Sequence, residues 1–199
     1  MDNATRSERT KSAVIAAALA IIARDGAGRL TLDAIARESG VSKGGLLHQF
    51  PTKRAVLAAL LEQQADHYDS FAQAFREAHG ADYAEPVLAA QIAAYREVMK
   101  GANSITSAIL AAIAEDPTFL NPLQEREQAS LALIREQAAD PEQALSRLYS
   151  AQGLALSTIL GLCPLSADAR ERMFEHLLDE SRWLNAPGDG RKSGELPSR

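Results

Sequence analysis

Apolar residues recur at helical spacing through most of the chain, in stretches separated by glycine and proline. Between Ser12 and Ala23 the apolar positions cover a broad helical face. Ala, Leu, Glu, Gln and Arg dominate the later stretches, and the alternating pattern of strands is nearly absent. The pattern predicts an all-α protein with later helices over about residues 53–80, 86–100, 104–115, 122–139, 141–162 and 167–185.

Two short helices are predicted between the first helix and the long one that starts near residue 53. Thr31 can cap the first short helix through its hydroxyl. Gly40 can end this helix because glycine adopts positive φ without a Cβ clash. Ser42 can then cap a second helix over residues 43–49, and Pro51 ends it.

The spacing within this pair is that of a helix-turn-helix. Ala36 stands four residues before Gly40, where a small side chain lets the second helix cross closely, and Leu46 can fill the angle between the helices. With Leu46 and Phe50 turned inward, the remaining face of the second helix carries no acidic side chain. Such a helix can enter the major groove of DNA. A three-helix head of this kind, followed by a helical C-terminal body, is the predicted architecture.

Residues of this pair can contact either bases or phosphates. Gln49 can pair bidentately with adenine, Lys43 can donate to guanine, and Leu47 can touch a thymine methyl group. The hydroxyl caps and Lys53 stand at helix N-termini, where free amides favour a phosphate. The candidate DNA-binding residues are Thr31, Ser42, Lys43, Gly44, Gly45, Leu47, His48, Gln49, Thr52 and Lys53.

Charge is unevenly distributed along the chain. Residues 1–56 carry nine Lys and Arg against five Asp and Glu, whereas residues 57–199 carry twelve against twenty-one. A basic first quarter followed by an acidic remainder indicates that only the N-terminal part meets a polyanion. Arg6, Arg9 and Lys11 form a basic arm that is either a solvated terminus or a contact to phosphate or the minor groove.

Two motifs, Ser39-Gly40-Val41-Ser42-Lys43-Gly44 and Phe50-Pro51-Thr52-Lys53, resemble those of the TetR (tetracycline repressor) family over about residues 8–60. The chain departs from many members at Leu47 and His48, where they carry an aromatic pair. The resemblance implies an all-helical dimer that binds operator DNA through three N-terminal helices and a small effector inside the body. We expect a DNA-binding domain over 1–52, a ligand-binding and dimerisation domain over 53–185, and a disordered tail over 186–199.

The last two predicted helices are candidates for the dimer interface. The first is apolar or small on nearly all sides from Ala151 to Leu162, and the second carries an apolar stripe opposite its charged residues. Packed on their mates, they give a four-helix interface with two-fold symmetry; alternatively, the stripes serve only the core of one chain. The candidate interface residues are Leu156, Ile159, Leu160, Phe174, Leu177, Leu178 and Ser181.

The middle helices carry the candidate effector site. Apolar and aromatic residues at helical spacing there can line a cavity, with core packing as the alternative for most of them. The sequence pattern places no charged residue within an apolar stripe, so we expect a hydrophobic or amphipathic effector. The candidate ligand-binding residues are Tyr68, Gln91, Tyr95, Met99, Ile109, Ile113, Phe119 and Gln152.

Other functional classes lack support in the sequence. The four histidines fall on different predicted helices without a partnering motif, so we expect no catalytic residues, metal site or cofactor, and no enzyme. The single Cys163 excludes an intrachain disulfide framework and favours a reducing cytoplasm. The uncharged runs over 12–23 and 148–167 are interpreted as buried against protein rather than in a membrane.

These observations predict a cytoplasmic one-component transcriptional regulator, acting as a repressor. It binds double-stranded palindromic operator DNA as a homodimer and leaves it when a small molecule fills the body. The alternative is a helical DNA-binding protein that is regulated by a protein partner instead of a ligand.

Overall fold

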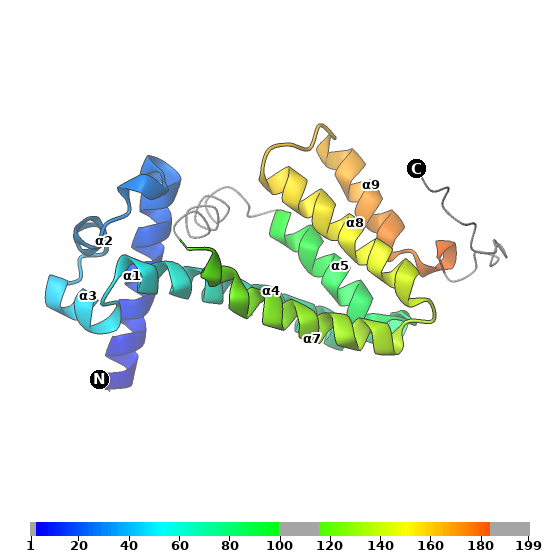
Figure 1. Cartoon of the computed structure of the whole chain (residues 1–199), viewed down its shortest axis with the longest axis horizontal. Helices are drawn as coiled ribbons and strands as arrows, with labels where there is room; N and C mark the ends of the chain where they lie inside the picture. The colour runs from blue at the N-terminus through cyan, green and yellow to red at the C-terminus, as the bar shows by residue number, and fades with distance from the viewer. Residues whose placement is uncertain (1–2, 100–115, 184–199) are drawn as a thin grey trace, which may run out of the picture.

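The computed structural model describes residues 3–99 and 116–183, which form helices and connecting turns without a strand (Figure 1). The predicted helix over 104–115 and the predicted tail over 186–199 lie outside these residues. The α-helices are α1 (Asn3–Asp25), α2 (Leu32–Ser39), α3 (Lys43–Gln49), α4 (Lys53–His79), α5 (Pro86–Val98), α7 (Asn121–Gln137), α8 (Pro141–Ile159) and α9 (Ala167–Leu178). Short 3-10 helices cover Ala27–Arg29, Gly80–Asp82, Pro117–Leu120 and Glu180–Arg182.

Figure 1 shows α1, α2 and α3 grouped at one end, which we call the head. The long α4 leads from the head beneath the remaining helices, which together with α4 form the body. Within the body, α5, α8 and α9 lie side by side. The all-α prediction and the order of head and body are confirmed.

Hydroxyl side chains cap the N-termini of α2, α3 and α4. The hydroxyl oxygens of Thr31, Ser42 and Thr52 accept from backbone amides three residues further along, over 3.1, 3.2 and 3.1 Å. Gly40 ends α2 with a φ of 68°, in the left-handed region that favours glycine. These predicted boundaries are confirmed. Each cap satisfies an otherwise unpaired amide and contributes on the order of 1 kcal/mol to stability.

One apolar cluster unites the head with the first turns of α4. Leu46 of α3 and Ile35 of α2 are fully buried in it, against Val14 and Ala18 of α1 and Val56 of α4. The start of α4 is therefore part of the head's core. A change in the direction of α4 will move α3 with it.

A second contact ties the body to the head, at the 3-10 helix that precedes α7. Phe119 is buried in the head cluster, with the guanidinium of Arg54 lying 4.5 Å from its ring centroid. Arg54 also donates to the hydroxyl of Thr118 over 3.1 Å and forms an ion pair with Asp116. Phe119, which was predicted from the sequence to line the effector site, is instead buried in the head core.

The core of the body forms around α5. This helix begins at Pro86, which suits the first helical turn because it lacks an amide hydrogen. Its residues from Val87 to Ala94 are buried except Gln91, so it is apolar on nearly all sides. Leu148 and Leu154 of α8 and Phe174 of α9 share its cluster.

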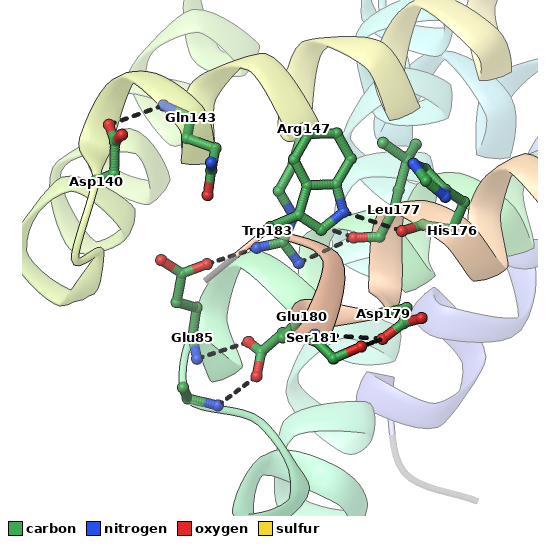
Figure 2. Close-up of polar contacts among 11 residues, drawn as sticks. Glu85, Asp140, Gln143, Arg147, His176, Leu177, Asp179, Glu180, Ser181 and Trp183 are labelled. Atoms are coloured by element: carbon green, nitrogen blue, oxygen red, sulfur yellow. Dashed lines mark hydrogen bonds and ion pairs between the residues drawn. The ribbon is translucent and has the colours of Figure 1, made fainter. Parts of the chain in front are cut away.

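A buried arginine joins three parts of the body, as Figure 2 shows. The side chain of Arg147 on α8 is inaccessible to solvent, and its Nη1 donates to the carboxylate of Glu85 over 2.6 Å. Its Nε and Nη2 donate to the carbonyl oxygen of Leu177 over 3.1 and 2.9 Å. The ring of Trp183 lies across the guanidinium at 5.7 Å. Arg147 thus connects α8 to the residue before α5 and to the last turn of α9.

The last two helices are shorter than predicted. Helix α8 ends at Ile159, because Gly161 adopts a φ of 69° and the amides of Leu162 and Cys163 turn back to the carbonyl of Ser157. Helix α9 ends at Leu178 rather than Asn185. There the chain turns so that the carboxylate of Glu180 can accept from the amides of residues 84 and 85 over 2.7 and 2.9 Å (Figure 2).

Among the described residues, none of the helices combines the length and the apolar character needed to cross a membrane.

Replacing Arg147 by Met, which retains an apolar stem, should lower the free energy of unfolding by about 3–5 kcal/mol. The loss arises because the Glu85 carboxylate would remain buried without its cation and the Leu177 carbonyl would lose two donors. Urea denaturation followed by circular dichroism measures the change. Arg172→Met, at an exposed position of α9, is the control and should change stability by less than about 0.5 kcal/mol. Equal stabilities of the two variants would contradict this role for Arg147.

Candidate functional site

Helix α3 presents a polar and aliphatic surface without acidic residues. Lys43, Gly44, Leu47 and His48 are exposed, while Leu46 is fully buried beneath them. These four exposed residues were all predicted to face DNA. Their helix is held in place by the caps and by the head core, so the surface is presented by a packed element rather than a loop.

Two other residues predicted to face DNA have partners within the head. The side-chain amide of Gln49 donates to the hydroxyl of Ser7 on α1 over 2.8 Å, and Gln49 is partly buried. To pair with an adenine, Gln49 must leave Ser7. Gly45 is also partly buried, and a Cβ atom there would lie 3.2 Å from the Ser42 hydroxyl oxygen. The small size of Gly45 therefore serves the cap of α3.

Ion pairs partly neutralise the head surface. The ammonium of Lys43 lies 2.8 Å from a carboxylate oxygen of Asp33 on α2, and this contact holds the pKa of Asp33 below its usual value. Arg24 on α1 binds Glu38 of α2 over 3.0 Å and likewise lowers the pKa of Glu38. Both residues of the Lys43 pair are well exposed, and exposed pairs contribute little to stability. A DNA phosphate or base can therefore take Lys43 from Asp33 at small cost.

The residues predicted to meet phosphates lie at helix starts. Thr31 and Thr52 are exposed, and their hydroxyls are engaged in the caps of α2 and α4. Lys53 is the first residue of α4 and is partly buried. At these positions the helix dipole and the unpaired amides favour a negatively charged group.

Four of the residues predicted to bind a ligand meet in the interior of the body. The hydroxyl of Tyr68 on α4 donates to the side-chain oxygen of Gln91 on α5. The ring centroids of Tyr68 and Tyr95 lie 5.3 Å apart, and the Tyr95 phenol is hydrogen-bonded to Gln152 on α8. Burial raises the pKa of both tyrosines above the usual value, so their phenols stay neutral. This interior is polar, whereas the surrounding α5 residues are apolar.

Of the three further candidates for ligand binding, Met99 packs, like Tyr95, against the apolar cluster of the body. Ile109 and Ile113 lie outside the described residues.

Glu127 on α7 also belongs to this interior, although the sequence analysis did not select it. One carboxylate oxygen, Oε1, is buried, and no group hydrogen-bonds to it within residues 3–99 and 116–183. Burial raises the pKa of Glu127, and its charge in turn raises the pKa values of Tyr68 and Tyr95. In the sequence, Glu127 follows Glu125 and Arg126, and such a run of charges is typical of a solvated face. No local signal separates it from its neighbours.

The residues predicted for the dimer interface divide into buried and exposed sets. Phe174 and Leu177 are buried in the body's own cluster, and Leu178 packs against it, so the stripe of α9 serves the core of one chain. The hydroxyl of Ser181 donates to Asp179 over 2.5 Å in the turn after α9. Arg147 and α5 hold this side of α9 inward in the single chain, and a role of α9 in a dimer interface stays a prediction.

Helix α8 retains an exposed apolar stripe. Leu156 and Leu160 are exposed, and Ile159 is partly buried. Tyr149 and Gly153 lie on the same face as Leu156 and Leu160, at helical spacings of four, three and four residues. A Cβ atom at Gly153 would meet nothing within 4 Å, so this face is open.

Comparison with known protein families gives two matches. The model for the bacterial regulatory proteins of the tetR family matches residues 14–60. The model for the tetracyclin repressor-like C-terminal domain matches residues 85–182. Together they cover more than two thirds of the chain. No curated protein matches the sequence.

Solved structures with the same fold span most of the chain. A candidate TetR-family transcriptional regulator from Rhodococcus sp. is 22% identical, with a TM-score of 0.62, over 86% of this chain and 95% of the other. A candidate transcriptional regulator from Streptomyces coelicolor A3(2) is 21% identical, with a TM-score of 0.61, over 85% and 96%. The flavonoid-responsive regulator FrrA is 25% identical, with a TM-score of 0.55, over 86% and 94%. With both family models matched in order, the chain belongs to the TetR family of DNA-binding transcriptional regulators.

Proposed function

We propose that this regulator is a dimeric repressor that binds a palindromic operator and releases it when a small molecule occupies the interior of the body. The observation that carries the DNA-binding part is the exposed face of α3. It combines a lysine, an open glycine and an aliphatic side chain on a helix without acidic residues. These groups suit the donors, acceptors and methyl groups of the major groove.

The dimer is supported by the apolar stripe of α8. Among the described residues, Tyr149, Leu156 and Leu160 leave large apolar surfaces exposed, and Gly153 between them allows a second helix to approach closely. Pairing this stripe with its copy about a two-fold axis removes it from water and sets two heads side by side. Two heads can then occupy successive major grooves of a palindrome.

The effector site is supported by the polar cluster between α4, α5, α7 and α8. Tyr68, Gln91, Tyr95 and Gln152 can give a ligand both aromatic contacts and hydrogen bonds. The related FrrA responds to flavonoids, which supports a small organic molecule as the effector of this chain too.

Release of DNA requires that occupancy of the body changes the head. Helix α4 provides a continuous connection, because Tyr68 borders the interior while Val56 and Leu57, three turns earlier, are buried in the head core. The contact of Arg54 with Asp116 and Phe119 adds a second connection from the body. A ligand that shifts α4 by even a small angle changes the spacing between two heads, and the palindrome no longer fits.

Lys43→Ala tests the DNA-binding surface. Removing this cation should weaken binding to an operator selected from random DNA, and it should reduce the slope of log affinity against log salt by about one per subunit, since one fewer counterion is released. Fluorescence anisotropy at several salt concentrations measures both quantities. Arg76→Ala, at an exposed position in the body part of α4, is the control and should leave both unchanged. If Lys43→Ala behaves like the control, α3 does not meet DNA at this residue.

Leu156→Glu tests the dimer. Leu156 is 54% exposed in a single chain, so the substitution should leave the fold intact. In the proposed dimer interface, however, it would bury two unpaired carboxylates, one from each subunit. The variant should sediment as a monomer and lose most of its affinity for the palindrome. Leu133→Glu on α7, where the leucine is 45% exposed, is the matched control and should remain dimeric. A dimeric Leu156→Glu protein with normal operator affinity would exclude this face of α8 from the interface.

A further inference from the structure

A partly buried carboxylate on α7 lies close enough to the two tyrosines of the body to raise their pKa values. Arg126 holds α7 against α4, with its Nη1 2.9 Å from a carboxylate oxygen of Asp66 and 2.8 Å from one of Asp69. Glu127 is the next residue of α7, and its Oε1 is buried without a hydrogen-bond partner among the described residues. Unsatisfied buried carboxylates are costly, so this one requires an explanation beyond folding.

The groups near Glu127 do not neutralise it. The phenols of Tyr68 and Tyr95 feel its negative charge, yet their hydroxyls are bound to Gln91 and Gln152 respectively. The guanidinium of Arg126 already serves Asp66 and Asp69. Among the described residues, the buried oxygen of Glu127 is therefore left without a cationic hydrogen-bond partner, which is a local deficit of positive charge.

Two aromatic rings accompany this deficit. The rings of Tyr68 and Tyr95 are tilted by 58° relative to each other, with their centroids 5.3 Å apart. Aromatic faces attract cations, most strongly where water is excluded. A carboxylate beside two tyrosines therefore matches a positive charge carried on an apolar body. It does not match a metal ion, which needs several oxygen or nitrogen ligands, and the described residues contain no such group.

We propose that the effector of this regulator is an organic cation, with the Glu127 carboxylate as its counterion and Tyr68 and Tyr95 against its charged group. This inference deepens the proposed function and rests on it, since it assigns a charge to the ligand of the same interior. Bound there, the cation supplies the positive charge that the free protein lacks. A cation that contacts both Tyr68 and Glu127 also favours one relative position of α4 and α7, because these residues come from the two helices.

Two probes of equal shape separate charge from apolar contact. Benzyltrimethylammonium carries one positive charge, whereas neopentylbenzene has carbon in place of nitrogen and is neutral. Titration calorimetry on the full-length protein should show that the cation binds at least tenfold more tightly than its neutral isostere. Glu127→Gln should remove this preference while leaving the affinity for neopentylbenzene unchanged. Glu125→Gln, at an exposed position of the same helix, should retain it.

A stability measurement excludes a folding defect as the cause. Because burial raises the pKa of Glu127 in the folded state, its ionised form destabilises the free protein once the pH exceeds the unfolded pKa, about 4.3. Tyr68 and Tyr95 stay neutral and Arg126 stays charged throughout the acidic and neutral range. Glu127→Gln should therefore unfold at a higher urea concentration than the natural protein at pH 7, and this difference should shrink as the pH falls towards 4. Loss of cation binding in a more stable protein identifies a binding role.

The same titrations of the natural protein and the Glu127→Gln variant can also contradict the inference. Equal affinity for the two probes, retention of the preference in Glu127→Gln, or no binding of benzyltrimethylammonium would each overturn the inference. Operator binding without any probe is measured in parallel. A protein that binds its operator but not the cation keeps the proposed function and loses only this inference, whereas a protein that binds no operator loses the proposed function.

Discussion

The body depends on the burial of one positive charge. Arg147 reaches from α8 to Glu85 before α5 and to the carbonyl of Leu177 at the end of α9, and its side chain is inaccessible to solvent. Such a group specifies an arrangement, because a shift of any of the three segments leaves a charge or a carbonyl unpaired. It fixes α9 against α5, with Trp183 and Glu180 closing the end of the bundle (Figure 2). On the part of the body that the structure describes, the outer face of α8 leaves apolar side chains exposed.

The contrast between Arg147 and Glu127 relates stability to regulation. Arg147 has its charge fully matched, whereas the buried oxygen of Glu127 has no partner among the described residues. Arg147 pairs with Glu85 before α5 and with Leu177 of α9, whereas Glu127 follows Arg126, which pairs with Asp66 and Asp69 of α4. The first turns of α4 belong to the head core. A ligand can supply the hydrogen-bond or ionic partner that the buried oxygen of Glu127 lacks on the inner face of the body. We propose that ligand binding at that face is transmitted to the head through α4.

Local rules made the head predictable from sequence. Thr31 and Ser42 accept from amides three residues further along, and Gly40 acts through its own positive φ, so their roles follow from local sequence. The body depends on contacts between distant segments. Phe119 enters the head only because a segment far along the chain pairs with α4. The stripe of α9 has the same periodicity whether it faces α5 or a second chain, and the burial of Glu127 depends on the placement of α7 rather than on its neighbours in sequence.

The central claim is that two α3 helices read DNA as a symmetric pair. Selection of bound sequences from a pool of random DNA, using the purified protein, tests it most directly. The account predicts enrichment of a palindrome whose half-sites are centred about one helical turn apart, roughly 34–36 Å, because each head occupies one major groove on the same side of the duplex. Enrichment of a single unrepeated site, or no enrichment at all, would contradict it.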